Sequence, residues 1–143
     1  MKCTRCFLLL AFVTVLAGCD PGPVRRGADG ALLGRGHTRG PRDDGRWTLF
    51  APDGRRVATG AFVDGAPDGC WKQFGPDGEL AEQRQFARGI PDGDAMTFHP
   101  DGTPAARGRY HHGVPDGPWW YWTPTGELDV QRSGYYRSGV RLP

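Results

Sequence analysis

The sequence lacks the features that mark several common functional classes. Its 18 basic residues nearly balance its 16 acidic residues, so it has no excess of positive charge of the kind found in non-specific nucleic-acid binders. The only serines are Ser133 and Ser138, and neither lies in the sequence context of a catalytic nucleophile. Four cysteines are too few for a disulfide-dense scaffold. We therefore expect a protein that is not an enzyme, uses no cofactor and binds no nucleic acid.

Long hydrophobic runs are also scarce. The longest largely apolar run spans residues 7–16 and would cover roughly 15 Å as a helix, about half of the ~30 Å hydrocarbon core of a bilayer. Lys2 and Arg5 precede it, with no acidic residue. A positively charged start followed by a short apolar run predicts a signal peptide over residues 1–18 rather than a membrane-spanning anchor.

A short motif closes this run and resembles the lipobox of bacterial lipoproteins. The motif consists of Leu16, Ala17, Gly18 and Cys19. The resemblance implies cleavage before Cys19 and attachment of lipid to its thiol, and several acyl chains anchor a protein stably. The alternative is a secreted protein that is cleaved at Ala17 or Gly18. We expect a lipid-anchored, periplasm-facing envelope protein; Asp20 favours the inner membrane, and the outer membrane stays open as an alternative.

The cysteines fit this interpretation. Cleavage removes Cys3 and Cys6, and lipidation uses Cys19, so Cys70 would be the only free thiol of the mature chain. No histidine and acid pair surrounds Cys70. We predict that it is a small buried hydrophobic residue rather than a reactive nucleophile.

Residues 19–43 are expected to form a flexible basic tether. They contain no aromatic residue, and residues 19–42 hold five arginines against two aspartates. Asp29-Gly30 and Gly40-Pro41 in this segment resemble the second half of a degenerate repeat.

The 23 glycines and 13 prolines would be typical of disorder in an aperiodic chain, but here they recur at fixed positions. From Asp44 the sequence repeats with a period of 24, which predicts four units over 44–67, 68–91, 92–115 and 116–143. Each unit opens on Asp-Gly, has a second turn motif such as Pro-Asp-Gly, and carries aromatic residues at three positions. The predicted repeat core consists of Trp47, Phe50, Phe62, Trp71, Phe74, Phe86, Phe98 and Tyr110.

Each unit is predicted to be a β-hairpin. Two short segments, roughly 46–51 and 55–63 in the first unit, are separated by Pro-Asp-Gly and by Asp-Gly-x-Pro-Asp-Gly, which we interpret as turns. Within the units, no ten-residue window is both free of Gly and Pro and apolar at helical spacing. Trp47 and Phe50 fit strict strand alternation poorly, which predicts a bulge or a twist. Because one hairpin cannot bury its aromatic residues alone, the units should form an elongated, single-layer antiparallel sheet.

The pattern Asp-Gly-x-Trp-x-x-Phe-x-Pro-Asp-Gly over residues 44–141 resembles the MORN repeat, in the variant form of bacterial proteins described as YwqK-type antitoxins. The resemblance implies successive β-hairpins in one extended sheet that serves as an interaction surface. It further implies scaffolding, membrane attachment or neutralisation of a toxin by binding. The third unit departs from the pattern at Ala95, where Trp is expected, and the fourth departs at Thr125.

The last unit holds an excess of aromatic residues. They make a candidate binding platform of Trp119, Trp120, Tyr121, Trp122, Tyr135 and Tyr136. Trp and Tyr offer large, rigid contact areas to a protein, peptide or glycan. In the alternative interpretation, residues 140–143 fold over this cluster as a cap.

Histidine and aspartate residues give little sign of a metal site. The histidines are His37, His99, His111 and His112. Adjacent strand residues point to opposite faces, so His111 and His112 should not share a metal ion, and we expect no metal site. The aspartates that recur at equivalent positions of the units are expected to serve the turns rather than calcium.

Together these features predict a non-enzymatic, lipid-anchored envelope repeat protein that acts as a protein-binding or scaffolding module. Its partners would be the membrane, through Cys19, and another protein. Two alternatives stay open: a toxin-neutralising protein of the antitoxin or immunity type, and an envelope glycan binder that uses the C-terminal aromatic cluster.

Overall fold

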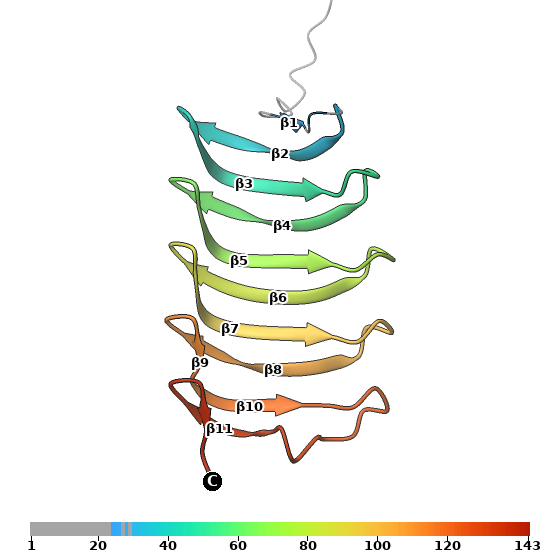
Figure 1. The fold of residues 1–143 in the computed structure, drawn as a ribbon, viewed down its shortest axis with the longest axis vertical. Coiled ribbons are helices and arrows are strands. Elements are labelled where there is room, and N and C mark those ends of the chain that lie inside the picture. The colour runs from blue at the N-terminus through green and yellow to red at the C-terminus, as the bar shows by residue number, and fades with distance from the viewer. Residues whose placement is uncertain (1–23, 27, 29) are drawn as a thin grey trace, which may run out of the picture.

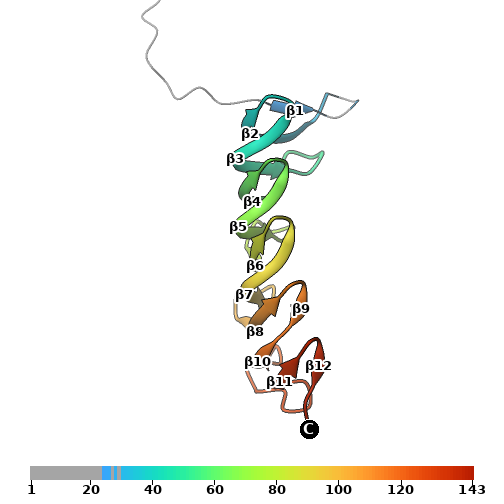
Figure 2. The same cartoon turned by 90° about the vertical axis from the view of Figure 1, so that its left-hand side faces the viewer.

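The computed structural model describes residues 24–26, 28 and 30–143, which form one open antiparallel sheet of twelve strands. Strands β1 to β8 and then β10 to β12 pair in chain order, and β9 pairs with β8 beside this path. They lie one below another along the long axis, and the sheet is narrow when seen from its edge (Figures 1 and 2). This confirms the predicted all-β, single-layer stack of hairpins and is consistent with MORN-like repeats.

The strands differ in length between the middle and the ends of the sheet. Their bounds are Val24–Arg26 (β1), Leu32–Arg39 (β2), Arg42–Phe50 (β3), Arg56–Val63 (β4), Ala66–Phe74 (β5), Leu80–Ala87 (β6), Ile90–Phe98 (β7), Pro104–His111 (β8), Val114–Pro115 (β9), Gly117–Tyr121 (β10), Gly134–Arg137 (β11) and Val140–Arg141 (β12). Strands β2 to β8 have eight or nine residues each, whereas β1 has three and β12 has two.

The sheet begins earlier than the sequence predicts. Residues 32–39, which the composition assigns to a flexible tether, form β2 and pair with β3. β2 supplies the strand against which the first unit packs, since the Trp47 ring of β3 lies on Gly36. In β1, the Arg25 guanidinium lies 2.6 Å from the Asp43 carboxylate and 5.3 Å from the centre of the Trp47 ring. Residues 19–23 of the predicted tether lie outside the described residues.

The first three Asp-Gly pairs lie within strands rather than at turns, which corrects the prediction, and the fourth, Asp116-Gly117, lies at the break between β9 and β10. Gly45 in β3 and Gly69 in β5 have φ angles of +70° and +72° and lie near register shifts between neighbouring strands. The chain reverses earlier, at two-residue turns such as Asp64-Gly65, where both φ angles are positive (52° and 86°). Such turns match the twist of the strands that they join. The strands that open the units therefore start before the predicted segments.

These two-residue turns tie each unit to the one before it. In each case the turn glycine donates its N–H to the backbone carbonyl of the residue just before its own unit. This carbonyl belongs to one of the first residues after the preceding two-residue turn. The pairs are Gly65 to Asp43 (2.9 Å), Gly89 to Pro67 (2.7 Å), Gly113 to Pro91 (2.8 Å) and Gly139 to Pro115 (2.9 Å). This ladder of hydrogen bonds keeps the units in register along one margin of the sheet.

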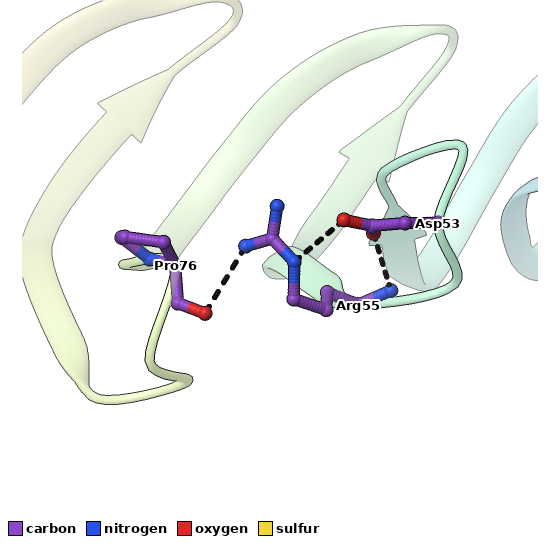
Figure 3. A network of polar contacts seen from close by, with 3 residues as sticks. All are labelled: Asp53, Arg55 and Pro76. Carbon is purple, nitrogen blue, oxygen red and sulfur yellow. Dashed lines mark hydrogen bonds and ion pairs between the residues drawn. The ribbon is translucent and has the colours of Figure 1, made fainter.

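The Pro-Asp-Gly turns lie along the opposite margin and agree with the prediction (Figure 1). In the first, Gly54 N–H donates to the carbonyl of Ala51 (2.9 Å), and the Asp53 carboxylate accepts from the N–H of Arg55 (3.0 Å). The Arg55 side chain donates to Asp53 (2.7 Å) and reaches the Pro76 carbonyl of the next turn (3.2 Å; Figure 3). The backbone N–H and then the side chain of Arg55 lower the pKa of Asp53.

A buried tryptophan on a glycine is the central packing element of the unit. Trp47, Trp71 and Trp119 are 3%, 7% and 4% exposed. Each ring lies on a glycine of the strand before it, where a Cβ atom would come within 2.1 to 2.2 Å of an indole carbon; these glycines are Gly36, Gly60 and Gly108. Each indole N–H also donates to the carbonyl of the residue after that glycine, at 2.7, 2.9 and 3.0 Å. The indole therefore has two roles: its ring fills the space above the glycine, and its N–H satisfies a backbone carbonyl.

The sheet has two different faces, because paired residues share a face and successive residues alternate. We call the face with the buried tryptophans the core face and the other the open face. On the core face, Phe62 packs edge-on against both Trp47 and Trp71, with ring centres 6.2 and 4.9 Å apart. Tyr110 packs in the same manner against Trp119.

The predicted aromatic core is divided between these faces. The register shift expected near Phe50 is present, but the extra residue belongs to β4, where pairing moves from Leu49–Ala58 to Phe50–Arg56. Phe50 therefore keeps the alternation of β3 and lies on the open face, opposite Trp47. Its equivalents Phe74 and Phe98 are also half-buried.

The third unit departs from the pattern at two positions that compensate for each other. Ala95 stands where the other units have tryptophan, and Arg84 stands where they have the glycine. The two residues are directly paired across β6 and β7. The Arg84 guanidinium lies 4.9 Å from the centre of the Tyr110 ring and forms an ion pair with Glu82. In the other units a tryptophan lies on a glycine, whereas in the third unit the large side chain is Arg84 and its small partner is Ala95.

This exchange predicts a non-additive mutant cycle. Ala95→Trp alone should destabilise the chain by about 1–3 kcal/mol, because the indole competes with the Arg84 side chain for one space. Adding Arg84→Gly should remove most of that cost, giving a coupling of about 0.5–3 kcal/mol in urea unfolding. Strictly additive effects of the two substitutions would contradict the account.

The Asp53 turn predicts a defined pH dependence. Because its pKa is lowered in the folded chain, the carboxylate stabilises the fold above its unfolded pKa, and this contribution is lost as pH falls through the folded value. The deficit of Asp53→Asn in melting temperature should therefore be full at pH 7 and shrink below about pH 4. Asp64→Asn is the control, since its carboxylate makes no hydrogen bond or ion pair with any described residue. An Asp53→Asn deficit that does not change with pH would refute the proposed turn interaction.

Candidate functional site

A continuous row of side chains crosses the open face from β2 to β10. Each member is the direct pairing partner of the next in the neighbouring strand, so all share one face. The row consists of Arg35, Thr48, Thr59, Lys72, Gln83, Met96, Arg107 and Trp120. At ~4.8 Å between strands, its seven steps extend over about 34 Å. We call this set the cross-strand row.

The row is basic, and its charged members are exposed. Arg35, Lys72 and Arg107 carry positive charge, and no member is acidic. Arg109 also lies on the open face, where it pairs with Asp94 across β7 and β8. Many of the acidic residues lie in the turns at the margins, as Asp53 and its equivalents do. A chain that has little net charge thus presents a predominantly basic central strip on one face.

Two shallow depressions lie on the open face beside the row. The first, of about 660 Å³, is lined by residues of β3, β4 and β5, among them Arg46, Cys70 and Lys72. The second, of about 650 Å³, lies at the C-terminal end between Arg107, Trp120 and Trp122. Both are open to solvent, so they suit an extended surface contact better than an enclosed small molecule.

The structure splits the predicted aromatic platform. Trp120 and Tyr135 are 45% and 53% exposed, and they lie on the open face with the half-buried Trp122. Trp119 is instead a buried core residue, because alternation turns it onto Gly108. Of these four residues, only Trp120, Trp122 and Tyr135 can form a binding surface together. Trp119 is therefore removed from the predicted platform.

The remaining platform residues pack on the core-face side of the last unit. Tyr121 stacks on Trp119 with ring centres 5.9 Å apart, and the Arg132 guanidinium lies 4.3 Å from its ring centre. Burial raises the pKa of the Tyr121 phenol. Tyr136 donates its hydroxyl hydrogen to the Arg132 carbonyl (2.9 Å). The side chain that covers Tyr121 is thus Arg132, which precedes β11, and not a residue of the predicted cap at 140–143.

The last residues close the end of the sheet without covering the exposed aromatic surface. Arg141 in β12 donates from Nε to the carbonyl of Ser133 (3.0 Å), and Leu142 N–H donates to the carbonyl of Tyr135 (2.8 Å). These bonds hold the backbone of β11 and of the residue before it, while the Tyr135 side chain stays exposed.

Cys70 is exposed, which corrects its assignment as a buried hydrophobic residue. It follows the Gly69 bend in β5 and pairs with Gln85 on the open face. The prediction is wrong because the Asp-Gly bend lies within the strand, so the alternation that buries Trp71 turns the residue before it outward. The thiol lines the first depression of the open face.

His111 and His112 lie together, contrary to the expectation that they point to opposite faces. His112 is the first turn residue after β8 and has a φ of +48°, so strand alternation ends at His111. The two imidazole rings have centres 4.2 Å apart, and both face the carboxylate of Asp92. Of the other histidines, His99 contacts the Trp122 carbonyl at 3.1 Å, and His37 is exposed in β2.

The lipidation motif of Leu16, Ala17, Gly18 and Cys19 lies outside the described residues, so its prediction stays untested. In the described part of the chain, no helix is long and apolar enough to cross a membrane. Comparison with protein-family models gives no match, and comparison with curated proteins gives none either.

Proposed function

We propose that this chain is a non-enzymatic, lipid-anchored repeat protein of the bacterial envelope whose open face binds another protein, as a scaffolding or interaction module. Its identification as a MORN-like lipoprotein, faced to the periplasm and related to the antitoxin group, is part of the proposal. The cross-strand row carries the binding part of the argument, and the motif that ends at Cys19 carries the anchor.

The architecture supports binding over a long surface. The row crosses eight strands through seven direct pairs, and its charged members Arg35, Lys72 and Arg107 are exposed. The core face, in contrast, is committed to holding the units together through buried tryptophans. The exposed side chains of the open face are therefore the ones that can vary without loss of the fold.

The chemistry of the row defines the kind of partner. An extended acidic segment of a protein, laid along the sheet axis, would meet three cationic side chains and then Trp120 at the end. Charge complementarity of this kind raises association rates and selects against basic partners. The exposed rings of Trp120 and Tyr135 would supply the desolvated contact that gives most of the affinity.

The depression lined by Arg107, Trp120 and Trp122 favours a second candidate, a glycan of the envelope. Sugar rings stack on exposed indole faces, and the neighbouring Arg109 and Asp94 offer hydrogen bonds. Neutralisation of an exported toxin is a special case of the first proposal, in which the acidic protein partner is the toxin.

Charge reversal in the row should abolish partner binding. We expect Lys72→Glu and Arg107→Glu chains to lose one stoichiometric protein that the unmodified chain retains after cross-linking in the native envelope. The reason is that each substitution places a carboxylate against an acidic segment, at a cost of several kcal/mol. Arg88→Glu is the matched control, since it makes the same change in a turn at the margin of the sheet.

Equal capture of that protein by all three variants would overturn the assignment of the open face. Retention on peptidoglycan that Trp120→Ala abolishes, with Arg88→Glu unaffected, would favour the glycan candidate instead. Circular dichroism of each variant checks that the sheet is intact.

The anchor has an independent test. We expect the full chain to partition into the detergent phase and the Cys19→Ser chain to move to the aqueous phase, since the acyl chains supply about 0.8 kcal/mol per buried CH₂. Cys70→Ser is the control, because this exposed thiol lies in β5 and not in the motif. A Cys19→Ser chain that stays in the detergent phase would refute lipidation.

A further inference from the structure

We propose that Asp92, His111 and His112 form a zinc-binding site at the margin of the sheet, an assignment that goes beyond the proposed function. The three residues come from two neighbouring strands and the turn that follows the second of them. Two neutral imidazoles and one carboxylate make a common donor set for catalytic zinc sites, with a fourth position open to water or another ligand.

The ligand atoms are already close to one another. His111 Nδ1 lies 3.9 Å from one Asp92 carboxylate oxygen, and His112 Nδ1 lies 3.7 Å from the other. One ligand atom from each residue can be chosen so that all three lie within 4.8 Å of one another. In tetrahedral zinc, with metal to ligand distances of about 2.0–2.2 Å, ligand atoms are about 3.4 Å apart. Both imidazoles are exposed, so their rotation can move the ligand atoms toward this spacing.

The backbone explains why two adjacent histidines can serve one ion. His111 is the last residue of β8 and projects from the strand, whereas His112 takes the left-handed conformation that the two-residue turn requires. Gly113 N–H is bonded to the Pro91 carbonyl (2.8 Å), which holds the turn against β7 and beside Asp92. The turn is thus fixed by bonds that do not involve the imidazoles.

The equivalent position in the preceding unit has the aspartate but neither histidine. Asp68 occupies the position of Asp92, but Ala87 and Arg88 stand where the histidines are. There the Asp68 carboxylate accepts a hydrogen bond from the backbone N–H of Arg88 (3.1 Å). The periodic aspartate therefore has a role in holding the turn, and only the unit with His111 and His112 adds nitrogen ligands to it.

A bound ion would cross-link the unit that has no buried tryptophan. Asp92 lies in β7, the strand of Ala95, and the histidines lie at the end of β8. The ion would hold together the ends of β7 and β8 at this margin. We therefore expect zinc to raise the thermal stability of the folded chain, because a ligand that binds only the folded state stabilises it by mass action.

The first test titrates Zn²⁺ into the full chain, purified in detergent without a histidine tag and carrying Cys70→Ser to remove the exposed thiol. We expect one zinc ion per chain and a zinc-dependent rise in melting temperature. His111→Ala and His112→Asn should each weaken binding at least about tenfold and remove the rise. Asparagine is chosen at position 112 because it tolerates the left-handed backbone. His37→Ala, another exposed histidine, should bind zinc as the parent does.

A second variant builds the site where it is absent. Ala87→His with Arg88→His should place two imidazoles beside Asp68 and raise the stoichiometry to two zinc ions per chain. Cobalt substitution should give an absorption spectrum of nitrogen and oxygen ligands without a thiolate band. Zinc uptake that is unchanged by His111→Ala and His112→Asn, a parent chain that takes up no zinc, or an unchanged stoichiometry in the double-histidine variant would each overturn the proposal.

Discussion

Three of the four units depend on one contact, the indole ring that lies on a glycine of the preceding strand. A single-layer sheet has no second layer to cover its side chains, so it must bury them within its own surface. Trp47, Trp71 and Trp119 achieve this because the missing Cβ lets the ring approach the backbone closely. The indole hydrogen bond to the next carbonyl then fixes the ring, and Phe62 or Tyr110 covers its edge.

The repeat period, the antiparallel hairpins and the Pro-Asp-Gly turns could all be predicted, because each rests on local chemistry that recurs from unit to unit. The true reversal at Asp64-Gly65 could not, since Asp-Gly at positions 68 and 69 carries the stronger turn signal yet forms a bend within β5. That one misplacement also explains the error at Cys70. The strand β2 was expected to lie in a flexible tether because the residues that it buries are Gly34 and Gly36, which leave no hydrophobic pattern.

The candidate site was predictable only in part. The excess of aromatic residues in the last unit indicated where Trp120 and Tyr135 are exposed, but not which rings face outward, because that depends on register with β8. The cross-strand row has no signature in the sequence, since its members lie far apart along the chain and are of mixed type. Likewise, His111 and His112 share a side only because a positive φ at His112 interrupts the alternation.

An open sheet exposes two edges, and unpaired strand edges invite pairing with other chains. Within the described residues the outermost strands are β1, with three residues, and β12, with two. Each offers far fewer free N–H and C=O groups than the long strands of the interior. A second chain could therefore gain only a few backbone hydrogen bonds at either edge. Short end strands thus act against fibre growth, although the strands between them are long and regular.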